Sequence, residues 1–171
     1  GLEPSVWQAD MRSFSADRAY EFVYCPFNAV QHLHTIDDQV ATLEAVYEAL
    51  APGGTFVFDV FVPSFKVICG TYDSWETTTF TLDGAALEHR SRSRIVDEVA
   101  QLVAVDQEVR DPDGNVVAET GHRIKLLPKR EVELLVRDSP FESWRATGDF
   151  TDEPLTDGHT AQVWELERGS A

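Results

Sequence analysis

The sequence has few cysteines, few basic residues and no long hydrophobic run. The two cysteines, Cys25 and Cys69, are too few for a disulfide scaffold and are typical of a reducing compartment, so we expect a cytoplasmic protein. No apolar run approaches the ~20 residues that a membrane helix needs. No basic segment followed by an apolar one opens the chain. We therefore expect no membrane-spanning segment, no membrane partner and no secretory signal.

Positive charge is scarce as well. Lys and Arg together number 14 and Asp and Glu number 30, which gives a net charge of −16; only three of the basic residues are lysines. Such a surface repels a phosphate backbone, so we expect no nucleic-acid partner. A high-salt source and an acidic mesophilic enzyme both account for this charge. The length of 171 residues and the hydrophobic fraction of 43% suit one globular domain.

The first third of the chain predicts a strand, a helix and a second strand. Residues 22–25 form a short apolar run that ends before Pro26, which indicates a buried strand. Thr35 is typical of a helix start, because an acid follows it three residues later. Apolar residues then recur at helical spacing up to the Pro-Gly-Gly turn at 52–54. Residues 55–62 are apolar on both faces, as in the central strand of a covered sheet. Together they predict a βαβ unit with a right-handed crossover.

Beyond residue 64, most of the chain predicts antiparallel β-structure. We expect strands at residues 75–82, 85–96, 100–109 and 116–127. Asp83-Gly84 and the Asp-Pro-Asp-Gly-Asn cluster at 111–115 are the turn signals between them. A helix should begin at Pro128, which suits a first helical turn. Two late strands at 143–150 and 159–167 should follow, separated by an acidic loop.

Three segments of the first third carry a resemblance to a known family. They read Trp-Gln-Ala-Asp-Met-Arg-Ser-Phe at 7–14, Phe-Val-Tyr-Cys-Pro-Phe-Asn at 22–28 and Leu-Ala-Pro-Gly-Gly-Thr-Phe at 50–56. In this order and at this spacing, they resemble the middle of a class I S-adenosylmethionine-dependent methyltransferase. The fold implied is α/β: a partial doubly wound, Rossmann-like sheet with an antiparallel β insertion and mixed final strands. The resemblance implies one domain, with an α/β core at 1–63 and 128–171 and an insertion at 75–127 that covers the site.

The resemblance also implies a function and exposes one missing motif. It implies an enzyme that uses S-adenosylmethionine to methylate a small-molecule nucleophile, and exposed strand edges favour a homodimer. The family carries a glycine-rich turn after its first strand, but no Gly-x-Gly lies among the eight residues before Ala9. We therefore expect this chain to correspond to the C-terminal two-thirds of such an enzyme, inactive by itself. The alternative is a non-enzymatic binding or interaction module on a degenerate methyltransferase-like core.

The resemblance implies a cofactor site built from two of these segments. Asp10 would accept a hydrogen bond from the adenine amino group, which a carboxylate suits because it only accepts. The backbone N–H of Met11 would meet the adenine ring. Cys25, Pro26 and Phe27 follow a strand at its carboxyl end, where open α/β sheets bind ligands. Three of these residues have a structural alternative: Asp10 as a turn or cap residue, Pro26 as a strand end, and Phe27 as a core residue.

His32 is the candidate catalytic residue. In the family, a histidine near this point faces the transferred methyl group, and a neutral imidazole can accept a proton near pH 7. The alternative is a core histidine bonded to the backbone. His32 and His34 also form a His-x-His pair, but no third ligand follows at recognisable spacing, so we expect no metal site.

Four further residues are candidates for substrate binding. Asp59 is a carboxylate inside an apolar strand, and a buried carboxylate must be paired or protonated. It either reaches the substrate pocket at the strand end or has a structural partner. Trp75, His122 and Arg123 lie in the β-rich part of the chain and are candidates for a lid over the substrate. Packing within the sheet is their structural alternative.

Overall fold

The computed structural model describes residues 3–170, which divide into two compact units. Unit 1 combines the chain up to Val62 with the chain from Pro128 onward, and unit 2 is Pro63–Leu127. Unit 2 is thus inserted between two parts of unit 1. Among residues 3–170, no helix is long and apolar enough to cross a membrane.

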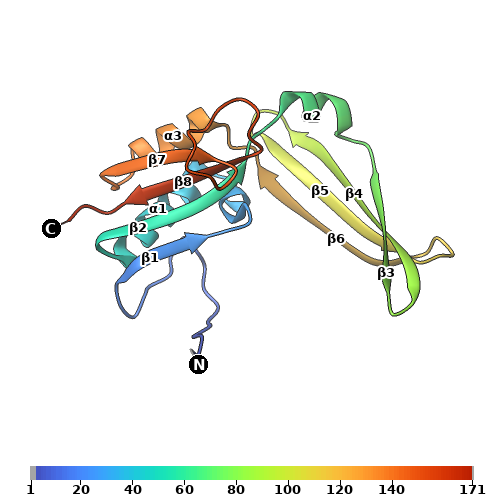
Figure 1. The fold of residues 1–171 in the computed structure, drawn as a ribbon, viewed down its shortest axis with the longest axis horizontal. Helices are drawn as coiled ribbons and strands as arrows, with labels where there is room; N and C mark the ends of the chain where they lie inside the picture. The colour runs from blue at the N-terminus through green and yellow to red at the C-terminus, as the bar shows by residue number, and fades with distance from the viewer. Residues whose placement is uncertain (1–2, 171) are drawn as a thin grey trace. The chain divides into compact units, whose positions relative to one another are not determined.

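Unit 1 is a four-stranded mixed sheet with helices (Figure 1). Its elements are β1 (Tyr20–Cys25), the 3-10 helix η1 (Ala29–His32), α1 (Ile36–Ala49), β2 (Leu50–Phe61), α3 (Lys129–Arg137), β7 (Ser143–Gly148) and β8 (Ala161–Glu167). The strand order is β1-β2-β8-β7. β1 pairs with β2 in parallel, whereas β8 runs antiparallel to both β2 and β7. The predicted strand–helix–strand unit and the mixed final strands are confirmed.

Helix α1 begins where the sequence predicts. Its buried face includes the polar residues Gln39 and Thr42, which was not expected. The Thr35 side chain accepts a hydrogen bond from the Asp38 backbone N–H at 3.1 Å, which satisfies one of the unpaired amides of the first turn. Leu43 and Val46 are buried as predicted. Ile36 belongs to the same apolar pattern, whose spacing predicts a buried residue, but as the first residue of the helix it is 66% exposed.

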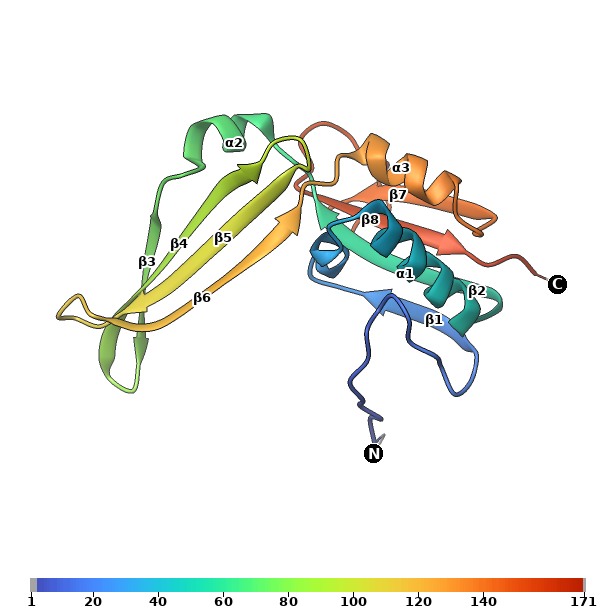
Figure 2. The same cartoon turned by 180° about the vertical axis from the view of Figure 1, so that it is seen from behind.

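The core of unit 1 lies between the sheet and helices α1 and α3, which cover the same face (Figure 2). Phe56 and Phe58 of β2 point to this face, and the Phe58 ring stacks on Trp164 of β8 at a centroid distance of 6.4 Å. Val132 and Val136 of α3 are also buried. Burying side chains of this size contributes about 1.5–3 kcal/mol each, so this layer stabilises the unit.

The described helices of unit 1 leave the other face of the sheet uncovered (Figures 1 and 2). β1 is the edge strand of the described sheet, and the prediction that it is buried is wrong in part. Phe22 is 58% exposed and Tyr24 is 45% exposed, because both point to the open face. Val23, between them, points to the helix-covered face beside Phe56.

Unit 2 is a four-stranded antiparallel sheet preceded by one short helix. It contains α2 (Phe65–Thr71), β3 (Glu76–Leu82), β4 (Ala85–Asp97), β5 (Leu102–Arg110) and β6 (Val116–Lys125), with the strands in chain order. Asp83 and Gly84 both have positive φ and form the predicted two-residue turn. Helix α2 was not predicted, although Ser64 caps it by accepting a hydrogen bond from the Val67 backbone N–H.

Candidate functional site

The segment that carries Asp10 is a tight turn held by an arginine. Arg12 donates two side-chain hydrogen bonds to the Asp10 carboxylate, at 3.0 and 2.6 Å, and its backbone N–H donates a third at 3.0 Å. The remaining terminal nitrogen of Arg12, Nη1, donates a hydrogen bond to Oδ1 of Asp38 in α1 at 2.8 Å. Hydrogen bonds from Arg12 lower the pKa of Asp10 from its ordinary value of 3.8 to about 2. Asp10 is therefore charged at neutral pH, and Arg12 joins its turn to the start of α1.

The loop after β1 has an unusual backbone that Asp59 stabilises. Phe27 and Asn28 both adopt left-handed conformations, with φ of 61° and 57°. Residues other than glycine rarely do so, because Cβ then approaches the following carbonyl. The two carboxylate oxygens of Asp59 accept one hydrogen bond each from the backbone N–H groups of Phe27 and Asn28, both at 3.0 Å. Asp59 is only 5% exposed, so the structural partner that we considered for it is present.

Two buried glutamines hold the next part of the same loop. Gln31 lies in η1 and is fully buried; its side-chain oxygen accepts a hydrogen bond from the backbone N–H of Phe61 at 3.3 Å. Gln39 of α1 donates a side-chain hydrogen bond to the backbone carbonyl of Leu33 at 2.9 Å. His32 lies between these two anchor points and is exposed. The backbone on both sides of His32 is thus fixed while its side chain faces outward.

The Asp10 turn and the segment from η1 to the start of α1 line one open pocket of about 770 Å³. Its lining residues come from the Asp10 turn, from the end of η1 and from the first turn of α1: Gln8, Ala9, Asp10, Met11, Arg12, His32, Leu33, His34 and Asp38. The predicted cofactor residues Asp10 and Met11 therefore lie in one pocket with the predicted catalytic residue His32. The first turn of α1 contributes Asp38, already paired with Arg12, to the same wall.

The other predicted cofactor residues do not line this pocket. Cys25 is half-buried at the end of β1, and burial together with the Asp59 carboxylate raises the pKa of its thiol to about 11. Burial and Asp59 also raise the pKa of Tyr24 above its ordinary value. Pro26 is half-buried, whereas the Phe27 side chain is 88% exposed. The alternative of Phe27 as a core residue is excluded by this exposure.

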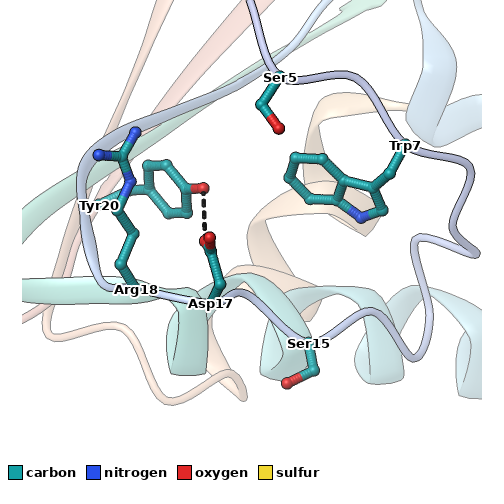
Figure 3. A pocket seen from close by; sticks show the side chains of 6 residues that line it. All are labelled: Ser5, Trp7, Ser15, Asp17, Arg18 and Tyr20. Atoms are coloured by element: carbon teal, nitrogen blue, oxygen red, sulfur yellow. Dashed lines mark hydrogen bonds between the residues drawn. The ribbon is translucent and has the colours of Figure 1, made fainter.

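A second pocket lies beside the start of β1 (Figure 3). It measures about 540 Å³ and is lined by Ser5, Trp7, Ser15, Asp17, Arg18 and Tyr20. Trp7 and Tyr20 approach it from opposite sides, and the Tyr20 hydroxyl donates a hydrogen bond to Asp17 at 3.3 Å (Figure 3). The Arg18 guanidinium lies 5.1 Å from the centre of the Tyr20 ring. Two aromatic rings make this pocket a rival position for a planar ligand.

The predicted lid residues all lie in unit 2. Trp75 precedes β3, and its ring lies beside the guanidinium groups of Arg90 and Arg92. His122 and Arg123 are consecutive residues of β6, so their side chains point to opposite faces of the sheet. Arg123 pairs with Ala104 and thus shares the face of the β4 arginines, whereas His122 does not. That unit 2 covers the site remains a prediction.

The pocket of about 770 Å³ suits a ligand that donates hydrogen bonds. Asp10 supplies a charged acceptor, and His32 supplies an imidazole close to the same space. Among residues 3–170, no group of three or more His, Cys, Asp or Glu side chains could hold a metal ion.

Sequence reasoning missed the residues that position the loop. Gln31 and Gln39 are 0% and 2% exposed, and each bonds to backbone on a neighbouring segment. A signal for Gln39 was available, because it lies four residues before Leu43 on the apolar face of the predicted helix. For Gln31, whose partner Phe61 is 30 residues away, the sequence holds no such signal.

Comparison with known proteins establishes the class of the fold. The chain has the fold of S-adenosylmethionine-dependent methyltransferases, and the resemblance seen in the sequence is confirmed. A solved S-adenosylmethionine-dependent methyltransferase from Clostridium acetobutylicum matches with a TM-score of 0.76 and 14% identity, over 99% of this chain and 66% of that one. The match therefore includes unit 2 as well as unit 1.

Particular relatives agree with this class. The methyltransferase CcbJ of Streptomyces caelestis matches with a TM-score of 0.73 at 20% identity, over 95% of this chain and 62% of that one. Among curated proteins, the candidate methyltransferase YqeM of Bacillus subtilis (strain 168) is 25% identical over 147 residues, which is 85% of this chain and 58% of YqeM. This chain thus spans less than two thirds of the length of these relatives. No family model matches the sequence.

Proposed function

We propose that the protein is an S-adenosylmethionine-dependent methyltransferase that acts on a small-molecule nucleophile. The observation that carries the proposal is that Asp10, Met11 and His32 line one pocket. The first two belong to the segment that resembles the family's adenine-binding motif, and the third lies near the point where the resemblance implies a histidine facing the methyl group. The fold supports the same activity.

Asp10 is suited to the adenine end of the cofactor. Its carboxylate is shared with Arg12, but an ionised carboxylate has about four acceptor sites and Arg12 donates only three hydrogen bonds. One site is left for the adenine amino group, which is a donor. The low pKa of Asp10 keeps the carboxylate unprotonated at neutral pH.

His32 is suited to proton transfer at the other end of the pocket. S-adenosylmethionine supplies an activated methyl group, so the protein has to position the nucleophile and accept one proton. A neutral His32 imidazole would accept that proton from an amine or hydroxyl group. The anchors at Gln31 and Gln39 fix the backbone on either side of it, which holds the base in place.

The substrate class rests on the relatives. CalS10 is an amino pentose methyltransferase from Micromonospora echinaspora, and KedS8 from Streptoalloteichus is a sugar N-methyltransferase. Both share the fold at 20% identity or less, with TM-scores of 0.69 and 0.68. We extend to this protein a small-molecule nucleophile. The exposed edge strand β1 favours pairing with a second copy, so we also propose a homodimer. We also propose that the complete protein supplies the glycine-rich cofactor motif.

Calorimetric titration of the full-length protein with S-adenosylhomocysteine tests the proposal. We expect saturable binding that Asp10→Asn weakens about tenfold or more, because the amide presents an N–H to another donor. Asp37→Asn is the matched control. It also removes one negative charge, but Asp37 lies in α1 and does not line the pocket. Absence of binding to the unmodified protein would contradict the proposal and favour a non-enzymatic binding module.

A further inference from the structure

One face of the unit 2 sheet concentrates arginine in a chain with a net charge of −16. Arg90, Arg92 and Arg94 alternate along β4, so all three point to the same face. Arg90 pairs with Glu108 of β5 and Arg92 with Asp106, and Arg110 shares that face of β5. We call these four arginines, Arg90, Arg92, Arg94 and Arg110, the arginine cluster.

Two carboxylates join the four arginines in pairs. Arg90 and Arg110 donate to the same oxygen of Glu108, at 2.6 and 2.7 Å. Arg92 and Arg94 donate to the same oxygen of Asp106, at 3.1 and 3.0 Å. Four guanidinium groups therefore share two carboxylates, and none of the four has a carboxylate to itself at hydrogen-bond distance. The same face also carries Glu88, Glu119 and Arg123, and Asp73 lies 3.9 Å from Arg92.

An aromatic ring and an unsatisfied donor add to this arrangement. The guanidinium carbons of Arg90 and Arg92 lie 4.8 and 4.7 Å from the centre of the Trp75 ring, close enough for cation–π attraction. The Nε–H of Arg92 is shielded from solvent and has no hydrogen-bond partner among the described residues. Buried donors are nearly always paired in native proteins, so this N–H is available to a ligand that accepts a hydrogen bond.

On the β6 side, the face has a gap at Gly121, between Glu119 and Arg123. Gly121 of β6 is the residue opposite Asp106, and a Cβ at Gly121 would lie 3.6 Å from the Asp106 carboxylate. Having no side chain there leaves the surface beside the cluster accessible. The side chains of Arg94 and Arg110 are 40% and 34% exposed, so their remaining N–H groups can reach a ligand.

We propose that the arginine cluster, with Trp75 beside it, binds the oxyanion group of a small molecule, either a phosphoryl group or a carboxylate. The planar fork of a guanidinium matches two oxygens of such a group, and each hydrogen bond is charge-assisted. Trp75 holds two of the guanidinium groups in place before the ligand binds. Every residue of this site belongs to unit 2, whereas the cofactor pocket is lined by residues of unit 1, so binding of the anion can be tested without S-adenosylmethionine.

Nuclear magnetic resonance on the ¹⁵N-labelled full-length protein tests the proposal directly. Pyrophosphate and succinate are titrated separately at constant ionic strength, while the Arg92 Nε–H and Trp75 indole signals are followed. We expect saturable shifts at both signals; tighter binding of pyrophosphate would identify a phosphoryl ligand, and tighter binding of succinate a carboxylate. Absence of saturable shifts with both anions would overturn the proposal and leave the cluster as a link between β4 and β5.

Two variants separate a defined site from general attraction of anions. Arg92→Gln should weaken binding of the preferred anion about tenfold or more, the effect expected for loss of a charge-assisted contact. Arg137→Gln removes the same charge from an exposed position on α3 and should change affinity less than twofold. Equal losses in the two variants would overturn the proposal. Because the titration of the unmodified protein needs no substitution, it decides the matter even where Arg92→Gln does not fold.

Discussion

The carboxylate of Asp59 accepts a hydrogen bond from the backbone N–H of Phe27 at 3.0 Å, across 32 positions of sequence. Its second oxygen accepts one from Asn28, so a single side chain of β2 holds both left-handed residues of the loop after β1. Helix η1 starts at the next residue and ends at His32. The position of the candidate catalytic histidine therefore depends on a carboxylate that we first considered as a substrate ligand.

We expect Asp59→Asn to destabilise the protein by about 1–3 kcal/mol, the usual cost of leaving a buried donor unpaired. The amide keeps one acceptor oxygen but turns an NH₂ group toward a backbone N–H. Urea unfolding measures the change, and Glu44→Gln, on the exposed side of α1, is the control and should stay within about 0.5 kcal/mol. Equal stability of Asp59→Asn and the unmodified protein would show that the loop needs no anchor.

Arg168 should stabilise the end of α1. Its guanidinium donates hydrogen bonds to the backbone carbonyls of Tyr47 and Leu50, at 2.7 and 2.8 Å, and lies 4.5 Å from the centre of the Tyr47 ring. Carbonyls at a helix end lack partners within the helix and favour a nearby cation. We expect Arg168→Gln to cost about 1–3 kcal/mol in thermal or urea unfolding. Arg168→Lys, which keeps the charge, should lose less; an equal loss would argue against an electrostatic contribution.

The two cysteines should differ in reactivity. Cys25 has a thiol pKa raised to about 11 by burial and by Asp59, whereas Cys69 is exposed. Because the thiolate is the reactive form, we expect iodoacetamide at pH 8 to modify Cys69 at least about tenfold faster. Peptide mass spectrometry over time measures both rates. Asp59→Asn should lower the pKa of Cys25 and speed its alkylation, and a pH–rate profile unchanged by this substitution would refute the assigned cause.

The Asp10–Arg12 pair should be visible in a pH titration. Hydrogen bonds from Arg12 lower the pKa of Asp10 from 3.8 to about 2. A depressed carboxyl pKa means that the pair contributes its full stabilisation above about pH 4 and loses it as the pH falls toward 2. Carbon NMR of the Asp10 carboxyl should give a midpoint near 2, and Arg12→Gln should move it upward. A midpoint near 3.8 in the unmodified protein would mean that the pair does not form in solution.

Much of the fold could be predicted because its signals are local. The cap at Thr35, the two-residue turn at Asp83-Gly84 and the apolar run of β2 each lie within a few residues of the feature that they determine. The exposure of Phe22 could not be read in this way. It depends on which strands and helices surround β1, and a short apolar run looks the same at the edge of a sheet as at its centre.

Residues of the candidate site could be predicted from the sequence only where they belong to a recognisable motif or lie close to one. Asp10 was identified from a motif segment and His32 from the histidine that the resemblance implies near this point, and both line one pocket. The contacts of Arg12 with Asp38 and of Gln31 with Phe61 join residues far apart in the chain, and no spacing rule reaches that far. Cys25, Pro26 and Phe27 belong to a matching motif, but motif order alone does not say which side chains face the pocket.

The most direct test of the central claim is to locate the cofactor on the full-length protein. Amide and side-chain NMR signals are followed during titration with S-adenosylhomocysteine. Our account predicts that the largest shifts occur at the Asp10 and Met11 amides and at the His32 imidazole, which line the larger pocket. The largest shifts at the Trp7 indole and Tyr20, which line the second pocket, would contradict it.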